Sequence, residues 1–173
     1  AELVDASLVA NPGCFPTSVL LPLQPLLIAK AIDAGTVIAD SKSGVSGAGR
    51  SPKQNLLFAE VSNNFSPYKI GRVHRHVPEI EQAMGWWSDD PPDLVFSPHL
   101  LPTQRGILST IYVPLKDELD DESVRALYTN AYDEEPFVDV LDQGKLATLA
   151  HVNYTNQCCI GLTLAGQILV ITA

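Results

Sequence analysis

Hydrophobic residues recur along the chain with two spacings, one helical and one extended. Between residues 16 and 34 the apolar positions lie three or four residues apart, which predicts a helix that ends at Gly35. Pro22 and Pro25 lie inside this stretch, and we expect them to bend its early turns. Two further segments have the proline or acidic residues that favour a first helical turn: residues 78–84 and 120–132.

Short apolar runs bounded by proline, glycine or polar residues predict strands over residues 36–39, 94–101, 107–115, 137–141, 158–164 and 167–172. Residues 68–77 also read as extended. In such a strand, alternation puts the imidazoles of His74 and His76 on one face and Arg75 on the other. The Ala165-Gly166 step suits a tight hairpin between the last two strands. We expect an α+β domain with a mixed, largely antiparallel sheet and helices on one face.

The bulk composition narrows the class of protein. The chain has 173 residues, 46% of them hydrophobic and 18% charged, which suits one domain with a real core. A formal net charge of -9 argues against nucleic acid and anionic membranes as partners, but not against a small anionic substrate. Three cysteines make a poor disulfide framework, and neither a signal peptide nor a membrane span is predicted. We expect a cytoplasmic protein, or a plastid protein if the source is a plant.

Cys14 is the leading candidate for a nucleophile. It lies in Asn11-Pro12-Gly13-Cys14-Phe15-Pro16-Thr17, ahead of the first predicted helix. Free N–H groups and the helix dipole favour a negative charge at such a position, and the thiolate is the nucleophilic form of cysteine. The alternative is a small buried cysteine beside a turn.

The pair His74 and His76 is the candidate acid/base, because imidazole exchanges protons near neutral pH. One alternative is a polar strand face in water. Another is a metal site completed by Cys158 or Cys159, but no spacing in the chain matches a closed zinc site, so we expect no metal.

A glycine-rich loop, Ser43 to Arg50, follows the first predicted strand. Its N–H groups and hydroxyls could cradle an anionic or amide-bearing ligand, or it could be a flexible surface turn. It lacks the Gly-x-Gly-x-x-Gly pattern of a dinucleotide-binding unit, so no such domain is predicted in this chain. Arg105, between two predicted strands, is either a clamp for carboxylate or phosphate or an arginine at a hairpin tip in water.

Four motifs taken together resemble those of the N-acetyl-gamma-glutamyl-phosphate reductases, a family of the arginine pathway. In chain order they are Asn11-Pro12-Gly13-Cys14-Phe15-Pro16-Thr17, Ser43-Gly44-Val45-Ser46-Gly47-Ala48-Gly49-Arg50, His74-Arg75-His76-Val77-Pro78-Glu79-Ile80 and Pro102-Thr103-Gln104-Arg105-Gly106-Ile107-Leu108. The resemblance implies a glyceraldehyde-3-phosphate dehydrogenase-like C-terminal domain. Residues 1–173 would form one catalytic and dimerisation domain. The N-terminal Rossmann domain for NADPH and a last C-terminal helix would lie outside this chain. A dimer or tetramer is also implied.

The same resemblance implies residue roles. Cys14 would attack the acyl phosphate and form a thioester, and hydride from NADPH would reduce it. His76 would move the proton, with His74 as the competing candidate. The loop residues Ser46, Gly47, Ala48 and Gly49 would lie near the nicotinamide. Four basic residues are candidates, by their chemistry, to hold phosphate or carboxylate: Arg50, Lys69, Arg72 and Arg105.

Three alternatives remain open at this stage. The chain could act mainly as an assembly module that is inactive alone. It could be a cysteine hydrolase that uses Cys14 and His76. Within the reductases, the substrate could be an aminoadipyl or aspartyl phosphate, because the sequence does not resolve the length or the blocking group of the acyl chain.

Overall fold

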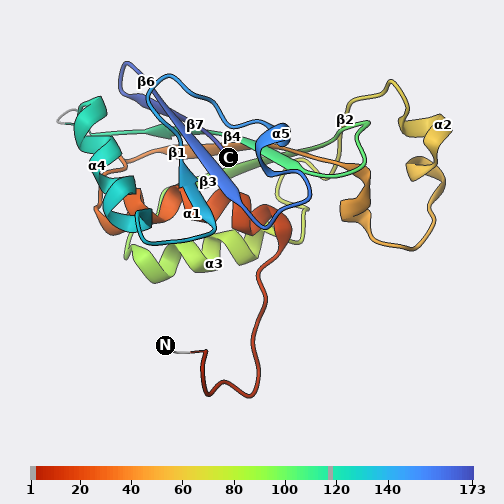
Figure 1. Ribbon diagram of the computed structural model, residues 1–173, viewed down its shortest axis with the longest axis horizontal. Coiled ribbons are helices and arrows are strands. Elements are labelled where there is room, and N and C mark those ends of the chain that lie inside the picture. Colours follow the sequence, from red (N-terminus) through yellow and green to blue (C-terminus); the bar gives the residue numbers. More distant parts are fainter. Residues whose placement is uncertain (1–2, 117–118) are drawn as a thin grey trace.

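The computed structural model describes residues 3–116 and 119–173, and in this part of the chain seven strands form one mixed sheet (Figure 1). The strands are β1 (Thr36–Ser43), β2 (Ser66–Pro67), β3 (Asp93–Leu100), β4 (Ile107–Pro114), β5 (Val138–Val140), β6 (Cys158–Ala165) and β7 (Ile168–Thr172). Their order in the sheet is β2-β3-β1-β4-β7-β6-β5. The β1–β3 and β5–β6 pairs are parallel and the other pairs are antiparallel. The predicted mixed, largely antiparallel sheet is therefore confirmed.

The three longer helices are α1 (Cys14–Ile28), α3 (Val77–Trp87) and α4 (Asp121–Tyr132). Figure 1 shows α1 and α3 side by side beneath the sheet, and both α1 and α4 contact strands of it. Two short helices, α2 (Phe58–Val61) and α5 (Leu149–Val152), and two 3-10 turns, η1 (Val45–Ala48) and η2 (Gln54–Leu56), lie in the connections. The lobe that contains α2 projects from the β2 end of the sheet.

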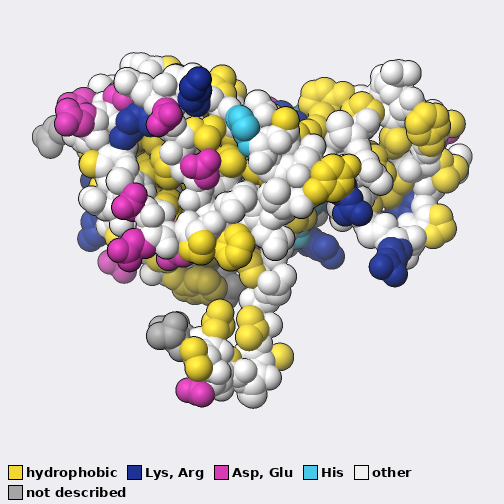
Figure 2. Space-filling model, viewed as in Figure 1, with side chains coloured by type: hydrophobic (Ala, Val, Ile, Leu, Met, Phe, Trp, Pro, Cys, Tyr) yellow, Lys and Arg dark blue, Asp and Glu magenta, His cyan; other side chains and the backbone are white. Residues whose placement is uncertain are grey.

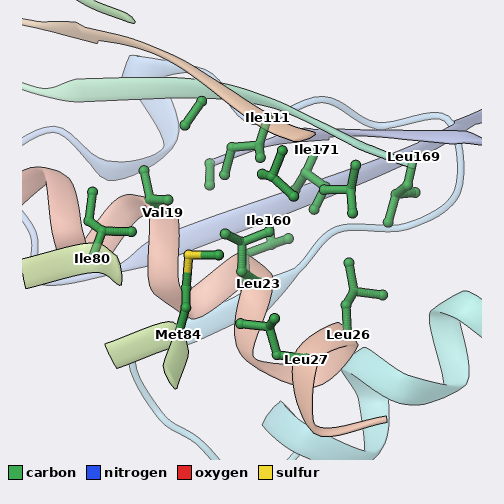
Figure 3. Close-up of a cluster of buried hydrophobic side chains, with 14 of the residues drawn as sticks. Val19, Leu23, Leu26, Leu27, Ile80, Met84, Ile111, Ile160, Leu169 and Ile171 are labelled. Atoms are coloured by element: carbon green, nitrogen blue, oxygen red, sulfur yellow. The ribbon is translucent and has the colours of Figure 1, made fainter. Parts of the chain in front are cut away.

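Alternation along β1 decides what each face of the sheet contacts. Val37 and Ala39 are buried in the core between the sheet and the helices, whereas Ile38 is 40% exposed on the opposite face of the sheet. Figure 3 shows how apolar side chains of α1 and α3 meet those of the strands. The labelled core residues are Val19, Leu23, Leu26, Leu27, Ile80, Met84, Ile111, Ile160, Leu169 and Ile171. This core holds the start of α1 and the start of α3 against the same end of the sheet.

Helix α1 tolerates its two prolines because α4 supplies a missing donor. Pro25 has no N–H to give to the carbonyl of Leu21, four residues earlier. The hydroxyl of Tyr132 donates to that carbonyl at 2.6 Å. The hydroxyl of Tyr128 donates to the carbonyl of Pro22 at 2.7 Å. The two tyrosines thus stabilise the helix where its own ladder is interrupted.

The predicted extent of the first helix, residues 16–34, is wrong at both ends. The helix begins at Cys14 and ends at Ile28. Lys30 adopts the left-handed φ of 53°, and the N–H of Ala31 bonds to the carbonyl of Leu26 at 2.9 Å, which is the pattern of a Schellman cap. The apolar periodicity ran past this cap because Ala31 is itself buried.

The remaining predictions fared differently. The other two helices form, and Asp120 caps α4 by accepting from the N–H of Ser123 at 2.8 Å. Strands β3 to β7 agree with the predicted ranges to within one residue at each end. Strand β1 continues four residues beyond the predicted Ala39 to Ser43, because β3 and β4 pair with it on both sides. The hairpin between β6 and β7 is confirmed, with Gly166 at a φ of +62°.

The extended segment predicted over residues 68–77 is wrong. After the short β2 the chain turns tightly, with left-handed φ angles of 50° at Lys69 and 71° at Arg72. His76 is already the N-cap of α3. Within the described residues, none of the helices is both long enough and apolar enough to cross a membrane.

Candidate active site

Cys14 is the first residue of α1 and its side chain is exposed. The thiol borders a cleft of about 480 Å³ between the start of α1, the start of α3 and the α2 lobe. No side-chain hydrogen bond from the N-cap residue Gly13 closes this helix end. The predicted position of Cys14 at a first helical turn is confirmed, and the alternative of a buried cysteine is wrong.

His76 lies directly against the backbone that precedes Cys14. A Cβ built on Gly13 would be 2.7 Å from Nε2 of His76, so only a glycine leaves room for the imidazole there. Nδ1 of His76 is buried and has no hydrogen-bond partner among the described residues. Cys14 and this imidazole therefore occupy the N-terminal ends of two neighbouring helices, α1 and α3.

His74 lies beside His76 in an aromatic cluster. The two imidazole centroids are 4.8 Å apart, and the rings of Phe15, Tyr68 and Phe96 lie 5.3 to 5.6 Å from His74. Nδ1 of His74 accepts a hydrogen bond from the backbone N–H of His76 at 3.2 Å. Both side chains are buried, so the predicted pairing on one side is correct although the segment is a turn and not a strand.

Burial governs the protonation of this cluster. It lowers the pKa of His74 to about 4, with the neighbouring His76, Lys69 and Arg75 acting in the same direction. Burial also lowers the pKa of His76, but the carboxylate of Glu79 opposes that effect. Burial raises the pKa of Tyr68 to about 12, helped by its proximity to Cys14. At neutral pH His74 is therefore neutral and Tyr68 keeps its proton.

The glycine-rich loop borders the cleft through Gly47 and Ala48, next to Cys14. Its N–H groups are largely used internally: those of Gly44, Val45 and Ser46 donate to carbonyls of the β3–β4 connection at 2.9 to 3.1 Å. The predicted cradle of N–H donors is therefore wrong, and the loop is a wall of the cleft. Of the four predicted loop residues, Ser46 and Gly49 lie outside the cleft lining among the described residues.

The basic residues near the cleft are only partly those predicted. Lys69 lines the cleft, and so do Lys53 and Arg75, which are not among the four basic candidates named from the sequence. Among the described residues, Arg50, Arg72 and Arg105 are not part of the lining. Arg72 instead forms an ion pair with Glu81 at 2.7 Å on the surface.

Arg105 does not lie at a hairpin tip. Strands β3 and β4 flank β1 on opposite sides, so residues 101–106 cross over the end of β1. A Cβ on Gly44 would be 2.8 Å from the backbone nitrogen of Arg105, which shows how closely this crossing packs on the loop. The side chain of Arg105 is exposed, and its backbone packs on the glycine-rich loop at Gly44.

Sequence reasoning missed Glu79 and Tyr68. A carboxylate oxygen of Glu79 accepts a hydrogen bond from the N–H of Gly13 at 2.7 Å. Its position three residues after His76 was taken only as a favourable acid in the first turn of a helix. Tyr68 lines the cleft opposite His74. No local pattern distinguishes it from an ordinary core tyrosine.

A buried chain of hydroxyls anchors the first turn of α1 to the sheet. Ser109 on β4 contacts Ser18 at 2.8 Å and Ser41 at 2.7 Å, and Ser18 donates to the carbonyl of Phe15 at 3.1 Å. Ser41 and Ser109 are fully buried. Each of these hydroxyls has a hydrogen-bond partner, which offsets the cost of burying it and ties the first turn of α1 to the sheet.

The other two thiols have the opposite environment. Burial raises the pKa of Cys158 to about 11, and burial together with Asp139 raises the pKa of Cys159. Across residues 3–116 and 119–173, no three His, Cys, Asp or Glu side chains come together as a metal site. Figure 2 shows acidic side chains over the α4 end of the molecule and Lys or Arg side chains beside the α2 lobe.

Comparison with known proteins agrees with this geometry. The family model described as "Semialdehyde dehydrogenase, dimerisation domain" matches residues 14–173, from Cys14 to the last strand. The chain belongs to this family. The predicted resemblance and the predicted fold, a glyceraldehyde-3-phosphate dehydrogenase-like C-terminal domain, are therefore confirmed.

Curated relatives of this semialdehyde dehydrogenase domain are named N-acetyl-gamma-glutamyl-phosphate reductase. The protein of Geobacter sp. (strain M21) is 49% identical over 176 residues, covering 100% of this chain and 51% of the relative. That of Desulfotalea psychrophila is 46% identical, covering 99% and 51%. The chain thus spans about half the length of the curated relatives it matches.

Solved structures share the fold of this semialdehyde dehydrogenase domain at low identity. A probable aspartate-semialdehyde dehydrogenase from Pseudomonas aeruginosa aligns with a TM-score of 0.69 and 14% identity, over 96% of this chain and 57% of its own. The aspartate-semialdehyde dehydrogenase from Francisella tularensis gives 0.71 and 13%, over 94% and 58%.

Proposed function

We propose that this chain is the catalytic and dimerisation part of an NADPH-dependent reductase of the arginine pathway. The reaction would convert N-acetylglutamyl 5-phosphate to N-acetylglutamate 5-semialdehyde and phosphate in the cytoplasm. The observation that carries the proposal is the meeting of Cys14 and His76 at two helix N-termini around one cleft. The name of the curated relatives supports the substrate.

In the first step, Sγ of Cys14 attacks the carbonyl carbon of the acyl phosphate. A C–S bond forms, the C–O bond to phosphate breaks, and phosphate leaves with the electron pair. The N-terminus of α1 favours the attacking thiolate. Lys53, Lys69 and Arg75 line the cleft and would neutralise the departing phosphate. We no longer favour Arg50, Arg72 and Arg105 for this role, because they do not line the cleft in the part of the chain described.

The second step needs a hydride at the thioester carbonyl, which NADPH would supply when bound. His76 then gives a proton to the resulting oxyanion and takes it back as the C–S bond breaks, which releases the aldehyde and the thiolate of Cys14. We assign this role to Nε2 of His76, because it lies against Gly13, next to Cys14. His74 instead holds the backbone of His76, and its low pKa of about 4 makes it a poor proton donor at neutral pH.

The cofactor site would be shared with a domain outside this chain. Of the four predicted loop residues, Gly47 and Ala48 line the cleft, and their lack of large side chains would suit a flat nicotinamide ring. The absence of free N–H donors in most of the loop argues against a phosphate there. The phosphates and the adenosine of NADPH would therefore be bound by the other domain.

Acylation by N-acetylglutamyl 5-phosphate tests this proposal on the chain itself. We expect a mass increase on the peptide that contains Cys14, release of one phosphate per acyl group, and removal of the adduct by hydroxylamine. Cys14→Ala should give neither the adduct nor phosphate. Aspartyl and aminoadipyl phosphates serve as matched competitors, and faster acylation by either would replace the proposed substrate. Absence of acylation by all three would contradict the reductase proposal, and hydrolysis of an activated ester that depends on Cys14 would then favour the hydrolase.

A second function, assembly, is supported by the open face of the sheet. Val95, Ile38, Tyr112 and Val170 form one row across β3, β1, β4 and β7, on the face opposite the helices. The first three are 48%, 40% and 37% exposed. We propose that a second copy of the chain covers this row, in line with the dimerisation domain named by the family model.

A further inference from the structure

The hydrogen bond between Glu79 and Gly13 joins the helices of the two reacting groups. Oε1 of Glu79 accepts from the N–H of Gly13 at 2.7 Å, across 66 residues of sequence. Gly13 is the N-cap of α1, one residue before Cys14. Glu79 belongs to the first turn of α3, three residues after the N-cap His76. A single carboxylate therefore spans from the acid/base helix to the backbone of the nucleophile.

Glu79 is available for this contact because another group takes its usual partner. A glutamate at this third helical position commonly folds back to the N–H of the N-cap residue. Here the N–H of His76 donates to Nδ1 of His74 instead, at 3.2 Å. With that donor occupied, the carboxylate of Glu79 reaches across to α1.

The hydrogen bond from Gly13 to Glu79 also bears on the close packing of His76 against Gly13. Nε2 of His76 would be 2.7 Å from a Cβ on Gly13, so a shift of Gly13 changes the separation of His76 from the residue that follows, Cys14. The same carboxylate acts on the charge of the imidazole, since Glu79 is the group that opposes the effect of burial on the pKa of His76. Position and protonation of His76 thus both depend on Glu79.

We propose that Glu79 is a positioning residue for the reaction: it holds the backbone of Gly13 so that Cys14 and Nε2 of His76 face the same substrate atoms. This inference rests on the proposed function and adds a role for a side chain that does not line the cleft in the part of the chain described. Glu79 makes two contributions: its oxygen accepts the hydrogen bond that fixes Gly13, and its negative charge favours the protonated imidazole of His76.

Two substitutions separate these contributions. Glu79→Gln keeps an oxygen that can accept from Gly13 but removes the charge, whereas Glu79→Ala removes both. Glu81→Gln is the matched control. Glu81 lies two residues further along α3, and its carboxylate pairs with Arg72 on the surface. Each variant is compared by hydrogen exchange of the Gly13 amide, by NMR titration of the His76 imidazole and by the rate of acylation at Cys14. Thermal unfolding of each variant verifies that it is folded.

We expect Glu79→Ala to accelerate exchange at Gly13 and to slow acylation by about tenfold, since small displacements of reacting groups are costly. Glu79→Gln should keep most of the exchange protection and move the titration of His76 to lower pH. Glu81→Gln should match the wild type in all three. If the wild type is acylated and Glu79→Ala is acylated at the rate of Glu81→Gln, the role of Glu79 is refuted while the proposed function stands. If the wild type is not acylated at all, the proposed function itself fails.

Discussion

The imidazole of His76 rests on the backbone of Gly13, with Nε2 only 2.7 Å from the place where a Cβ would stand. The backbone of Gly13 has φ -66° and ψ 159°, which any residue can adopt. Glycine is therefore required here for space and not for backbone freedom. That contact ties the residue before Cys14 to His76, and it makes a direct test of the proposed site possible.

Gly13→Ala should displace His76 and slow acylation of Cys14 by about tenfold. The ring cannot move easily, because His74 and Phe15 lie 4.8 and 6.0 Å from it, so we also expect a loss of about 1–3 kcal/mol in the free energy of unfolding. Gly85→Ala is the control, since a Cβ there meets no atom within 4 Å. That variant should keep full acylation and gain about 0.5–1 kcal/mol in stability, because alanine favours the helix. Equal acylation rates for the two variants would contradict the contact.

Stability should depend on the protonation of His74. Its pKa is about 4 in the folded chain against 6.5 as a model value, so the unfolded chain binds the proton more readily. The stabilisation is complete above pH 6.5 and is lost as the pH falls towards 4. Between pH 7 and 4.5 the wild type should lose roughly 2 kcal/mol more than His74→Asn, which retains an acceptor for the N–H of His76. Urea unfolding measures the difference, and His151→Asn, at an exposed position, should follow the wild type.

Tyr132→Phe should destabilise the fold by about 1–2 kcal/mol, because the carbonyl of Leu21 would lose the donor that replaces the missing N–H of Pro25. Tyr154→Phe, at a side chain 82% exposed, should change stability by less than about 0.5 kcal/mol. Chemical denaturation of both variants compares them. If Tyr132→Phe proves as stable as Tyr154→Phe, the hydroxyl is not what allows α1 to contain its prolines.

Ile38→Asp should shift the chain from dimer towards monomer in sedimentation, because it puts a charge in the middle of the exposed row on β1. Ile28→Asp is the matched control, since Ile28 is 58% exposed but lies on α1, on the other side of the sheet. A wild-type chain that is monomeric at high concentration, or a dimer that Ile38→Asp leaves intact, would argue against this face as the interface.

The sequence predicted the elements with strong local signals. The acidic cap at Asp120 and the Gly166 turn were both found where expected, because their signals are local backbone chemistry. The end of α1 was missed because Lys30 takes a left-handed conformation that is usual for glycine. The strand predicted over residues 68–77 was wrong because alternation of polar residues there reflects a cleft and not a pleated surface.

The candidate site divided in the same way. Cys14 at a helix start and the pair of histidines could be predicted, since the helix terminus and the residue types carry the chemistry. The basic residues that line the cleft could not all be predicted. Lys53 and Arg75 lie in turns, and the direction of a turn depends on how the surrounding chain packs. Arg72 shows the converse, a basic residue close in sequence whose charge is directed to Glu81 on the surface.

By itself, the sequence determined the family, most of the longer elements and the position of Cys14 at a helix start, because these depend on local spacing and on motifs in fixed order. Only the tertiary structure decided that Glu79 meets Gly13, that Nε2 of His76 lies against Gly13, and that the glycine loop packs on the β3–β4 connection. Those relationships join residues far apart in the chain. They follow from how α1 and α3 pack on one sheet, which no local pattern encodes.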